Sequence, residues 1–153
     1  MPGPVRSLVQ RVSSASVEVD GAVVGRIGRG LLVFVGVARD DGAADVEYTA
    51  SKIRDMRVFA DEQGKMNRSI VDAGGSVLVV SQFTLLGDLR TGRRPAFDGA
   101  AAPEAARACY GQLVDRLKAD GLPVETGVFQ AYMQVALVND GPVSLLLDSR
   151  RAL

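Results

Sequence analysis

Polar side chains that could take part in hydrolysis lie at residues 81–85, where the sequence SQFTL ends a strongly apolar segment. In the simplest interpretation, Ser81, Gln82 and Thr84 cap a strand by bonding to nearby backbone groups. In the functional interpretation this segment, with Phe83, forms the floor of a site whose backbone N–H groups and Thr84 hydroxyl face a developing oxyanion. The residue types alone leave both interpretations open.

Histidine is absent from the chain, and Cys109 is its single cysteine. These counts exclude Ser-His-Asp and Cys-His nucleophiles, and zinc sites built from histidine or several cysteines. Because Cys109 falls on the apolar stripe of a predicted helix, we expect a buried structural thiol. Thr84 has no base to activate it, which argues against a covalent nucleophile. We therefore expect no metal or cofactor, and an enzyme of this composition must use positioning, backbone dipoles, carboxylates, hydroxyls or groups of its substrate.

Three arginines, Arg90, Arg93 and Arg94, fall in a loop that contains glycine and proline and continues to Phe97. A solvated surface loop explains them most simply. As a binding site, their guanidinium groups match phosphate oxygens, and Phe97 offers a ring on which a base can stack. Lys+Arg and Asp+Glu are both 18, so the chain has no global positive field. Such a loop suits the end of a nucleic-acid strand better than a long duplex.

Residues 139–144 read NDGPVS between two apolar runs, 135–138 and 143–147. Both runs are predicted strands, and residues 139–142 have the composition of a turn that joins them. Gly141-Pro142 is nevertheless the kind of bond at which a cis peptide is readily accommodated, and a cis bond turns neighbouring carbonyls to one side. Two such oxygens could accept hydrogen bonds from an ammonium group. Composition does not decide between a turn and a recognition element.

The elements that hold these residues predict a single α+β domain over residues 1–153. Helical spacing predicts two main helices, one from Ala43 to Met56 and one opened by Pro103 and ended by Gly121. β-Branched residues and glycine punctuation predict strands at 5–13, 15–19, 22–28, 31–37, 76–85, 124–129, 131–138 and 143–149, with a hairpin formed by 57–61 and 65–69. The most apolar of them, 76–85, is expected at the centre. We expect a mixed or antiparallel sheet rolled toward a barrel.

The first ten residues, MPGPVRSLVQ, lack the apolar core of a signal peptide. No run approaches the about 18 apolar residues that a membrane span needs. A lone cysteine suits a reducing compartment. These features predict a cytoplasmic protein that does not contact membranes.

Taken together, SQFTL and NDGPVS resemble the motif pair of the D-aminoacyl-tRNA deacylase family. The resemblance extends over the whole chain in family order, through VQRVSSASVEVDG, GRGLLVFVGV, KMN, GRRPAF and VETGVF. It implies a homodimeric hydrolase, with active sites at the subunit interface, that cuts the ester between a D-amino acid and the 3′-terminal adenosine of tRNA. It also implies that glycyl-tRNA is accepted, and that the adenosine 2′-hydroxyl helps to activate water while backbone amides hold the oxyanion.

The resemblance also implies roles by position. Gly141 and Pro142 form a chiral filter: their cis bond enters the partner's site, where carbonyl oxygens meet the α-ammonium group and L side chains are excluded. Arg11 braces this loop. The adenosine and ester pocket is implied to contain Ser81, Gln82, Phe83, Thr84, Phe129 and Met133. With tRNA as the substrate, the loop of Arg90, Arg93 and Arg94 is the expected contact with its phosphates.

Some positions depart from the family pattern. Ser144 stands where the family usually has threonine, and Gln130 and Tyr132 occupy a stretch that is usually GA followed by a variable residue. One alternative is the related deacylase type with a trans glycine–proline bond, which removes L-alanine from the wrong tRNA. Another is a non-catalytic binder of the tRNA acceptor end, which has no need of a chiral filter. Turnover of a D-aminoacyl ester separates enzyme from binder.

Overall fold

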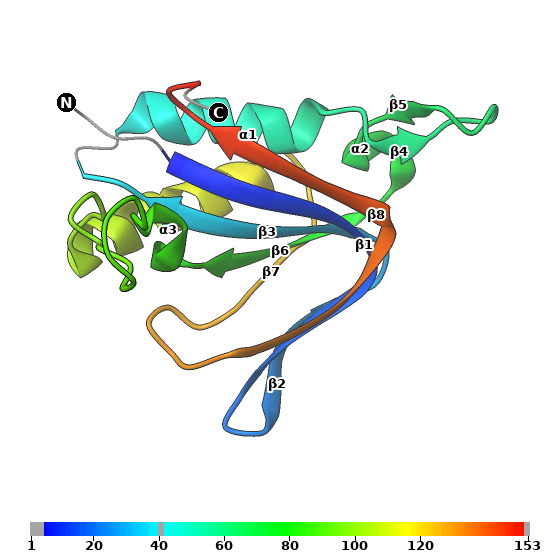
Figure 1. The fold of residues 1–153 in the computed structure, drawn as a ribbon. Coiled ribbons are helices and arrows are strands. Elements are labelled where there is room, and N and C mark those ends of the chain that lie inside the picture. Colours follow the sequence, from blue (N-terminus) through cyan, green and yellow to red (C-terminus); the bar gives the residue numbers. More distant parts are fainter. Residues whose placement is uncertain (1–4, 40–41, 152–153) are drawn as a thin grey trace.

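The computed structural model describes residues 5–39 and 42–151, which build a mixed sheet with helices packed on one face (Figure 1). Residues 1–4, the start of the segment considered above for a signal peptide, lie outside the described residues. The strands are β1 (Val5–Val19), β2 (Ala22–Ile27), β3 (Gly30–Val37), β4 (Phe59–Ala60), β5 (Met66–Arg68), β6 (Ser76–Ser81), β7 (Val124–Thr126) and β8 (Gln134–Asp148). The helices are α1 (Ala43–Asp55), α2 (Ile70–Ala73), the 3₁₀ turn η1 (Phe83–Leu86) and α3 (Pro103–Ala119).

The main sheet runs in the order β2-β1-β3-β6-β7, and β8 also pairs with β1. Strands β3, β6 and β7 are parallel to one another, whereas β1 is antiparallel to β2, β3 and β8. The long strands β1 and β8 bend together, so that half of each crosses beneath the parallel strands and nearly closes a barrel (Figure 1). The predicted α+β class and the rolled, mixed sheet are confirmed.

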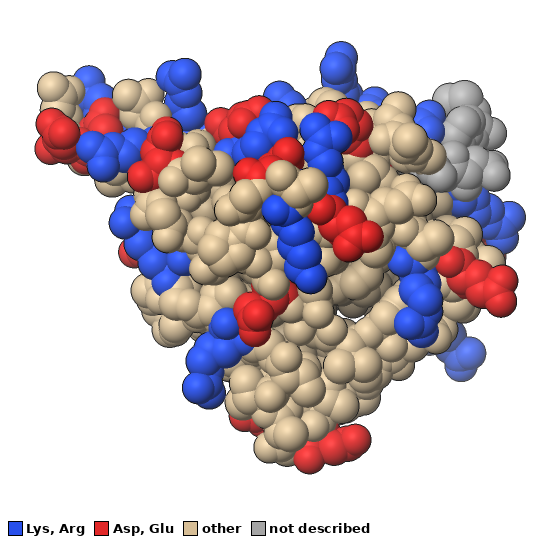
Figure 2. All heavy atoms as spheres, turned by 180° about the vertical axis from the view of Figure 1, so that it is seen from behind, with Lys and Arg blue, Asp and Glu red and all other residues tan. Residues whose placement is uncertain are grey.

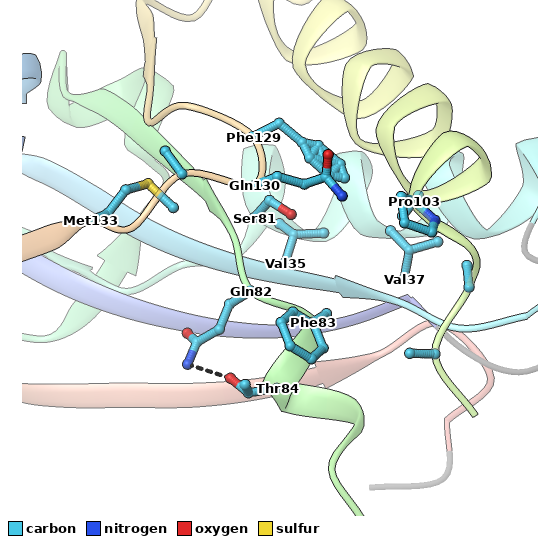
Figure 3. A pocket seen from close by; sticks show the side chains of 14 residues that line it. Val35, Val37, Ser81, Gln82, Phe83, Thr84, Pro103, Phe129, Gln130 and Met133 are labelled. Carbon is cyan, nitrogen blue, oxygen red and sulfur yellow. Dashed lines mark hydrogen bonds between the residues drawn. The ribbon is translucent and has the colours of Figure 1, made fainter. Parts of the chain in front are cut away.

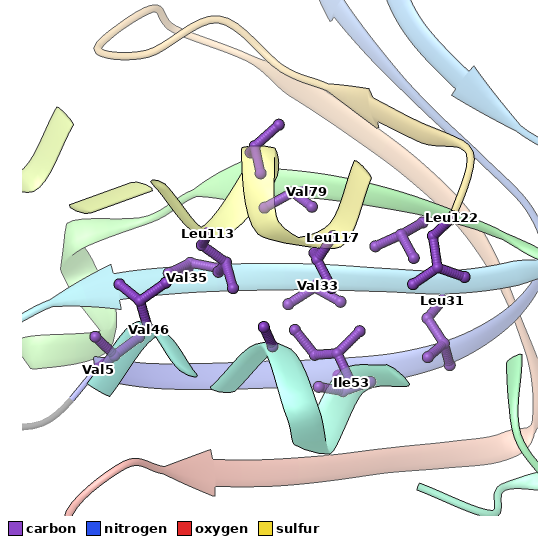
Figure 4. Packing of buried hydrophobic residues seen from close by; sticks show 14 of the residues in the cluster. Val5, Leu31, Val33, Val35, Val46, Ile53, Val79, Leu113, Leu117 and Leu122 are labelled. Carbon is purple, nitrogen blue, oxygen red and sulfur yellow. The ribbon is translucent and has the colours of Figure 1, made fainter. Parts of the chain in front are cut away.

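Side chains of β3 and β6 alternate between two hydrophobic clusters, as expected for central strands that are buried on both faces. The larger cluster lies between the sheet and the helices α1 and α3, and includes Leu31, Val33, Val79, Ile53 and Leu117 (Figure 4). The smaller cluster lies between the parallel strands and the bent halves of β1 and β8, and it includes Val12, Val17, Leu32, Leu78 and Val80. The two clusters fix β6 on both faces, and its last residue, Ser81, is therefore held in a defined place.

The second main helix begins at Pro103, as predicted, and its C-cap residue Asp120 precedes Gly121, whose φ is +88°. Cys109 is buried on the apolar stripe of α3 within the larger cluster, which confirms the predicted structural thiol. A third, short helix was not predicted. α2 is capped by Ser69, whose hydroxyl accepts from the Asp72 N–H while the Asp72 carboxylate accepts from the Ser69 N–H. This reciprocal pair is a capping box, and its S-x-x-D spacing is visible in the sequence.

The prediction of a turn at residues 139–142 was wrong. Both halves of β8 pair with β1 in the same antiparallel direction, Val138 opposite Ser14 and Ser144 opposite Gln10. Residues 140–143 form a bulge between the β1 partners Gln10 and Val12, because they have no β1 partners of their own. The chain therefore continues past Gly141-Pro142 instead of reversing. β1 is likewise one strand, where two had been predicted with a break near Ser14.

The predictions for β6, for β7 and for the first half of β8 were each too long at one end. β6 stops at Ser81 and the chain turns into η1, so that residues 82–85 are not part of the strand. β7 stops at Thr126 and β8 begins at Gln134, and residues 127–133 leave the sheet as a loop. Both departures bring irregular backbone to the same end of the sheet.

On the face shown in Figure 2, charges of both signs are intermixed, mainly along its upper part and edges, and no broad field of one sign covers it. This distribution agrees with the equal counts of basic and acidic residues. Among the helices of the described residues, none is long and apolar enough to cross a membrane.

Candidate active site

A pocket of about 500 Å³ opens where β3, the end of β6, the start of α3 and the loop 127–133 meet (Figure 3). Six residues expected at the site line it together: Ser81, Gln82, Phe83, Thr84, Phe129 and Met133. The remaining walls are mostly apolar and come from Val35, Val37, Ala100, Ala101, Pro103, Ala106, Gln130 and Ala131. The pocket thus combines an apolar body with polar groups gathered at the end of one strand, which is the usual composition of a small-molecule site.

The floor of the pocket is held by contacts between η1 and β3. The Gln82 N–H donates to the carbonyl oxygen of Val35 at 2.8 Å, so the chain stays on β3 as it leaves β6. Gly36 permits this approach, since a Cβ atom there would lie 2.5 Å from Cδ2 of Leu86 and 2.9 Å from the Gln82 oxygen. The absence of a side chain at Gly36 therefore allows η1 to seat against the sheet.

Two backbone donors and one hydroxyl are presented at this turn. The N–H groups of Phe83 and Thr84 precede the first hydrogen-bonded turn of η1, so no carbonyl within the turn accepts from them. The Gln82 Nε2 donates to the Thr84 Oγ1 at 3.0 Å, drawn as a dashed line in Figure 3. Among the described residues, neither a histidine nor a carboxylate lines the pocket. The turn is therefore suited to hold an oxyanion, not to deprotonate a nucleophile.

Phe129, which forms one wall of the pocket, packs against the buried Tyr110 of α3. The Tyr110 hydroxyl donates to the Val79 carbonyl oxygen at 2.8 Å, and burial raises the pKa of Tyr110 to about 12. Tyr110 therefore remains a neutral donor near pH 7. The centre of its ring lies 6.0 Å from the centre of the Phe129 ring. The guanidinium carbon of Arg107, which also belongs to α3, lies 4.7 Å from the centre of the Phe129 ring. Phe129 thus contacts both a buried phenol ring and an exposed cation of α3.

The arginine loop reaches the pocket through an aromatic pair. Phe97 packs edge-on against Phe83, with ring centres 5.0 Å apart. Arg90 forms an ion pair with Asp88 at 2.7 Å, and these hydrogen bonds lower the pKa of Asp88 to about 2. Arg93 and Arg94 are exposed, and neither forms an ion pair within residues 5–39 and 42–151. Of the three arginines, two are therefore available to an anion without first breaking a pairing.

The bulge that carries Gly141 and Pro142 lies away from this pocket. Their peptide bond is cis, the isomer expected of the D-specific deacylase type. Val35 of the pocket pairs with Ser7, whereas Asn139 pairs with Val12, and the five steps between these β1 residues span about 17 Å. In Figure 1 the bend in β8 lies at the right end of the sheet and the turn after β6 at the left. The chain does not bring its own bulge to its own pocket.

Arg11, on the neighbouring strand β1, holds the bulge through hydrogen bonds to backbone carbonyls. Its Nε donates to the Asp140 carbonyl oxygen at 2.8 Å and its Nη1 to the Val58 carbonyl oxygen at 2.6 Å. The Asn139 side chain closes the bulge internally: its Oδ1 accepts from the Val143 N–H at 2.7 Å, and its Nδ2 donates to the Ser144 hydroxyl at 3.0 Å. A hydroxyl at position 144 is what this contact needs, so serine replaces the usual threonine without loss of the bond.

Several residues at the site were missed by sequence reasoning. The apolar walls at Val35, Val37 and Ala106 read only as core residues in the sequence, and Arg107 read as an ordinary exposed helix position. The Asp88–Arg90 pairing had a visible signal, since acid and base stand two positions apart beside a glycine. Among the described residues, no group of three or more Asp, Glu or Cys side chains is placed to hold a metal ion.

Comparison with known proteins supplies a family. Residues 8–148 match the model of the family described as D-Tyr-tRNA(Tyr) deacylase. A relative from Anaeromyxobacter dehalogenans, named D-aminoacyl-tRNA deacylase, is 62% identical over 147 residues, which cover 96% of this chain and 99% of the relative. A relative of the same name from Syntrophobacter fumaroxidans is 57% identical over the same shares.

Two solved structures have similar folds. A c-Myc DNA unwinding element binding protein superposes with a TM-score of 0.87 at 39% identity, over 93% of this chain and 97% of that one. A probable eukaryotic D-amino acid tRNA deacylase superposes with a TM-score of 0.82 over 95% and 99%, and at 16% identity this likeness concerns the fold alone. With a family model that spans nearly the whole sheet and relatives above half identity, this chain belongs to the D-Tyr-tRNA(Tyr) deacylase family.

Proposed function

We propose that this protein hydrolyses the ester bond between a D-amino acid and the 3′-terminal adenosine of tRNA, and so releases the free amino acid and reusable tRNA. The relatives above half identity carry the name of this activity. The observation that carries the proposal in the structure is the pocket itself: Ser81 to Thr84 meet Phe129 and Met133 around one apolar cavity. An aromatic and thioether wall suits an adenine ring, and the polar turn suits the ester.

The mechanism follows from what the pocket contains. A water oxygen attacks the ester carbonyl, and the negative charge that develops on the carbonyl oxygen is held by the Phe83 and Thr84 N–H groups. The bond to the 3′-oxygen then breaks, and the proton that the attacking water gives up ends on that oxygen, so the tRNA leaves with a 3′-hydroxyl and the amino acid leaves as the free acid. Because no general base of the part of the chain that the structure describes lines the pocket, we assign activation of the water to the adenosine 2′-hydroxyl of the substrate. The protein contributes position and a pre-organised oxyanion site.

We further propose that the enzyme is a homodimer in which Gly141 and Pro142 of one subunit enter the pocket of the other. Three features support this arrangement: the bulge lies about 17 Å along β1 from its own pocket, Gly141 and Pro142 are exposed, and Arg11 braces the bulge through the Asp140 carbonyl oxygen. Among the described residues β8 pairs with β1 alone, and Val138, Leu145 and Leu146 leave apolar area exposed along it. A long edge strand of this kind calls for a partner.

A filter that acts by excluding side chains cannot reject an amino acid that has none. The cross-subunit carbonyls would accept hydrogen bonds from the α-ammonium group of either substrate, and a wall placed where an L side chain must go would meet nothing in glycine. We therefore include glycyl-tRNA among the substrates. The exposed cations Arg93 and Arg94 are proposed to contact the acceptor-end phosphates, with Arg90 contributing only after its Asp88 pairing opens.

The proposal predicts a large difference between enantiomers. Purified protein should release D-tyrosine from D-Tyr-tRNA at least about a hundredfold faster than L-tyrosine from L-Tyr-tRNA, because the rigid wall overlaps the L side chain. The measurement is acid-precipitable radiolabel remaining on each tRNA with time. Equal rates would contradict the chiral filter, and tight tRNA binding without turnover of either ester would instead favour the non-catalytic binder.

Thr84→Ala is expected to retain measurable hydrolysis, within about tenfold of the wild-type kcat, because it removes one hydrogen bond to Gln82 and no nucleophile. Thr84→Ser, which keeps the hydroxyl, is the matched control. Single-turnover kinetics with D-Tyr-tRNA and mass spectrometry of the quenched protein provide the measurement. A loss of about 10⁴-fold or more with unchanged tRNA affinity, or an acyl adduct on wild-type protein, would indicate a covalent mechanism.

A further inference from the structure

Arg107 occupies an unusual place beside the pocket. Its guanidinium carbon lies 4.7 Å from the centre of the Phe129 ring, and the preceding residue, Ala106, lines the pocket together with Phe129. The residue is exposed, so the guanidinium lies at the rim of the cavity and not in its interior. A cation is thus fixed at the edge of the wall that is proposed to hold the adenine.

This cation has no anionic partner within residues 5–39 and 42–151. Glu104 lies one helical turn away on α3 and forms no ion pair with it, whereas Arg116 on the same helix is paired with both Glu47 and Asp120. The contact with the Phe129 ring supplies neither an acceptor oxygen nor a negative charge. No hydrogen bond from the guanidinium to an acceptor within residues 5–39 and 42–151 accompanies it, so its N–H donors remain available for an anion.

We propose that Arg107 binds the phosphate that joins the 3′-terminal adenosine to the nucleotide before it. This inference rests on the proposed function, which places the adenosine in the pocket. The ribose of an adenosine held against Phe129 must send its 5′-phosphate out across the rim, because the next nucleotide stays outside the pocket. A planar guanidinium that already lies against a ring can offer two parallel N–H groups to phosphate oxygens, and it loses little freedom in doing so.

The alternative is that Arg107 only packs on Phe129 and holds that wall in place. The two roles differ in one respect that an experiment can use. A packing role affects every substrate that fills the pocket, whereas a phosphate contact affects only substrates that carry the phosphate. D-Tyr-tRNA has this phosphate and 3′-O-D-tyrosyl-adenosine lacks it.

The test compares Arg107→Gln with wild-type protein on both esters. We expect Arg107→Gln to lower kcat/KM for D-Tyr-tRNA about tenfold, mainly through KM, and to leave kcat/KM for D-tyrosyl-adenosine within about twofold. The slope of log kcat/KM for D-Tyr-tRNA against log salt should become shallower by about 0.7. Arg107→Lys, which keeps the charge but not the planar fork, should fall between the two.

Lys118→Gln is the matched control, since it removes an exposed cation from the same helix about 16 Å further along its axis. It should leave both substrates and the salt slope unchanged. An equal loss on the two esters in Arg107→Gln would assign Arg107 to packing and overturn the inference, as would the absence of any loss. Thermal unfolding of each variant checks that the fold is retained.

A binding measurement keeps the inference separate from the proposed hydrolysis. Wild-type protein should bind the dinucleotide CpA more tightly than adenosine, and Arg107→Gln should lose about tenfold in affinity for CpA with no change for adenosine. Failure of wild-type protein to hydrolyse either ester would overturn the proposed function, while the CpA and adenosine affinities would still decide whether Arg107 holds a phosphate. Equal affinities of CpA and adenosine for wild-type protein would overturn the inference.

Discussion

Gly141→Ala is expected to lower kcat/KM for D-Tyr-tRNA by about a hundredfold while leaving the pocket of each subunit intact. Gly141 has a backbone φ of +144°, a conformation that residues with a side chain rarely adopt. A Cβ atom there would lie 2.8 Å from Cγ2 of Val143 and 3.2 Å from Nη2 of Arg11. Both neighbours help to shape the bulge, so the added methyl group must displace the carbonyls that are proposed to meet the substrate's ammonium group.

The measurement is the initial rate of deacylation of D-Tyr-tRNA and L-Tyr-tRNA by the variant and by wild type. Gly28→Ala is the matched control, because a Cβ atom at Gly28 would have no neighbour within 4 Å and its φ is not in the restricted region. We expect this control to match wild type. Retention of full activity and full enantiomer preference by Gly141→Ala, in a folded dimer, would contradict the assignment of Gly141 to the filter.

The sequence was sufficient to predict the fold class because local patterns and the final packing agree over most elements. The unbroken apolar run of β6 indicated a strand buried on both faces, and Val79 and Val80 indeed belong to opposite clusters. The apolar stripe of α3, together with Pro103 at its start, predicted that helix correctly. In these places a short-range signal and a long-range contact favour the same structure.

Local patterns failed where tertiary pairing decides the path of the chain. Gly141-Pro142 has turn composition, yet the chain runs on, because β1 offers partners to β8 on both sides of the bulge. The polar residues Ser13 and Ser14 suggested a break in β1, but both are exposed on a strand that β8 pairs on either side of Ser13, at Val12 and Ser14. The pairing of β1 with β8 cannot be identified from a window of ten residues, because the two strands lie more than a hundred residues apart in the sequence.

The composition of the pocket was accessible only through family resemblance. Phe129 and Ser81 are separated by 48 positions, and no periodicity connects them. The bracing role of Arg11 depends on the carbonyl groups of Val58 and Asp140, which only the folded chain brings beside it. Arg107 had neither a motif nor a family expectation, because its meaning arises from a ring that reaches it from a loop 22 positions later.

Mixing two inactive variants is expected to restore activity if the bulge of one subunit serves the pocket of the other. Ala106→Trp fills the pocket from its own wall and leaves the bulge unchanged, whereas Gly141→Ala damages the bulge and leaves the pocket open. In a heterodimer of the two, the open pocket faces the intact bulge, so one of its two sites is functional. Random subunit exchange makes half of the dimers heterodimers, and the mixture should recover about a quarter of wild-type activity.

The reverse pairing makes the test decisive. A chain carrying both Ala106→Trp and Gly141→Ala, paired with a wild-type chain, leaves the wild-type pocket facing a damaged bulge, and such a heterodimer should be inactive. Two affinity tags allow each heterodimer to be purified before its D-Tyr-tRNA deacylation is measured. If the bulge instead served the pocket of its own chain, the first heterodimer would be inactive and the second would keep one working site. That reversed pattern would contradict the cross-subunit filter while leaving the deacylase function itself intact, because the wild-type site would still turn over its substrate.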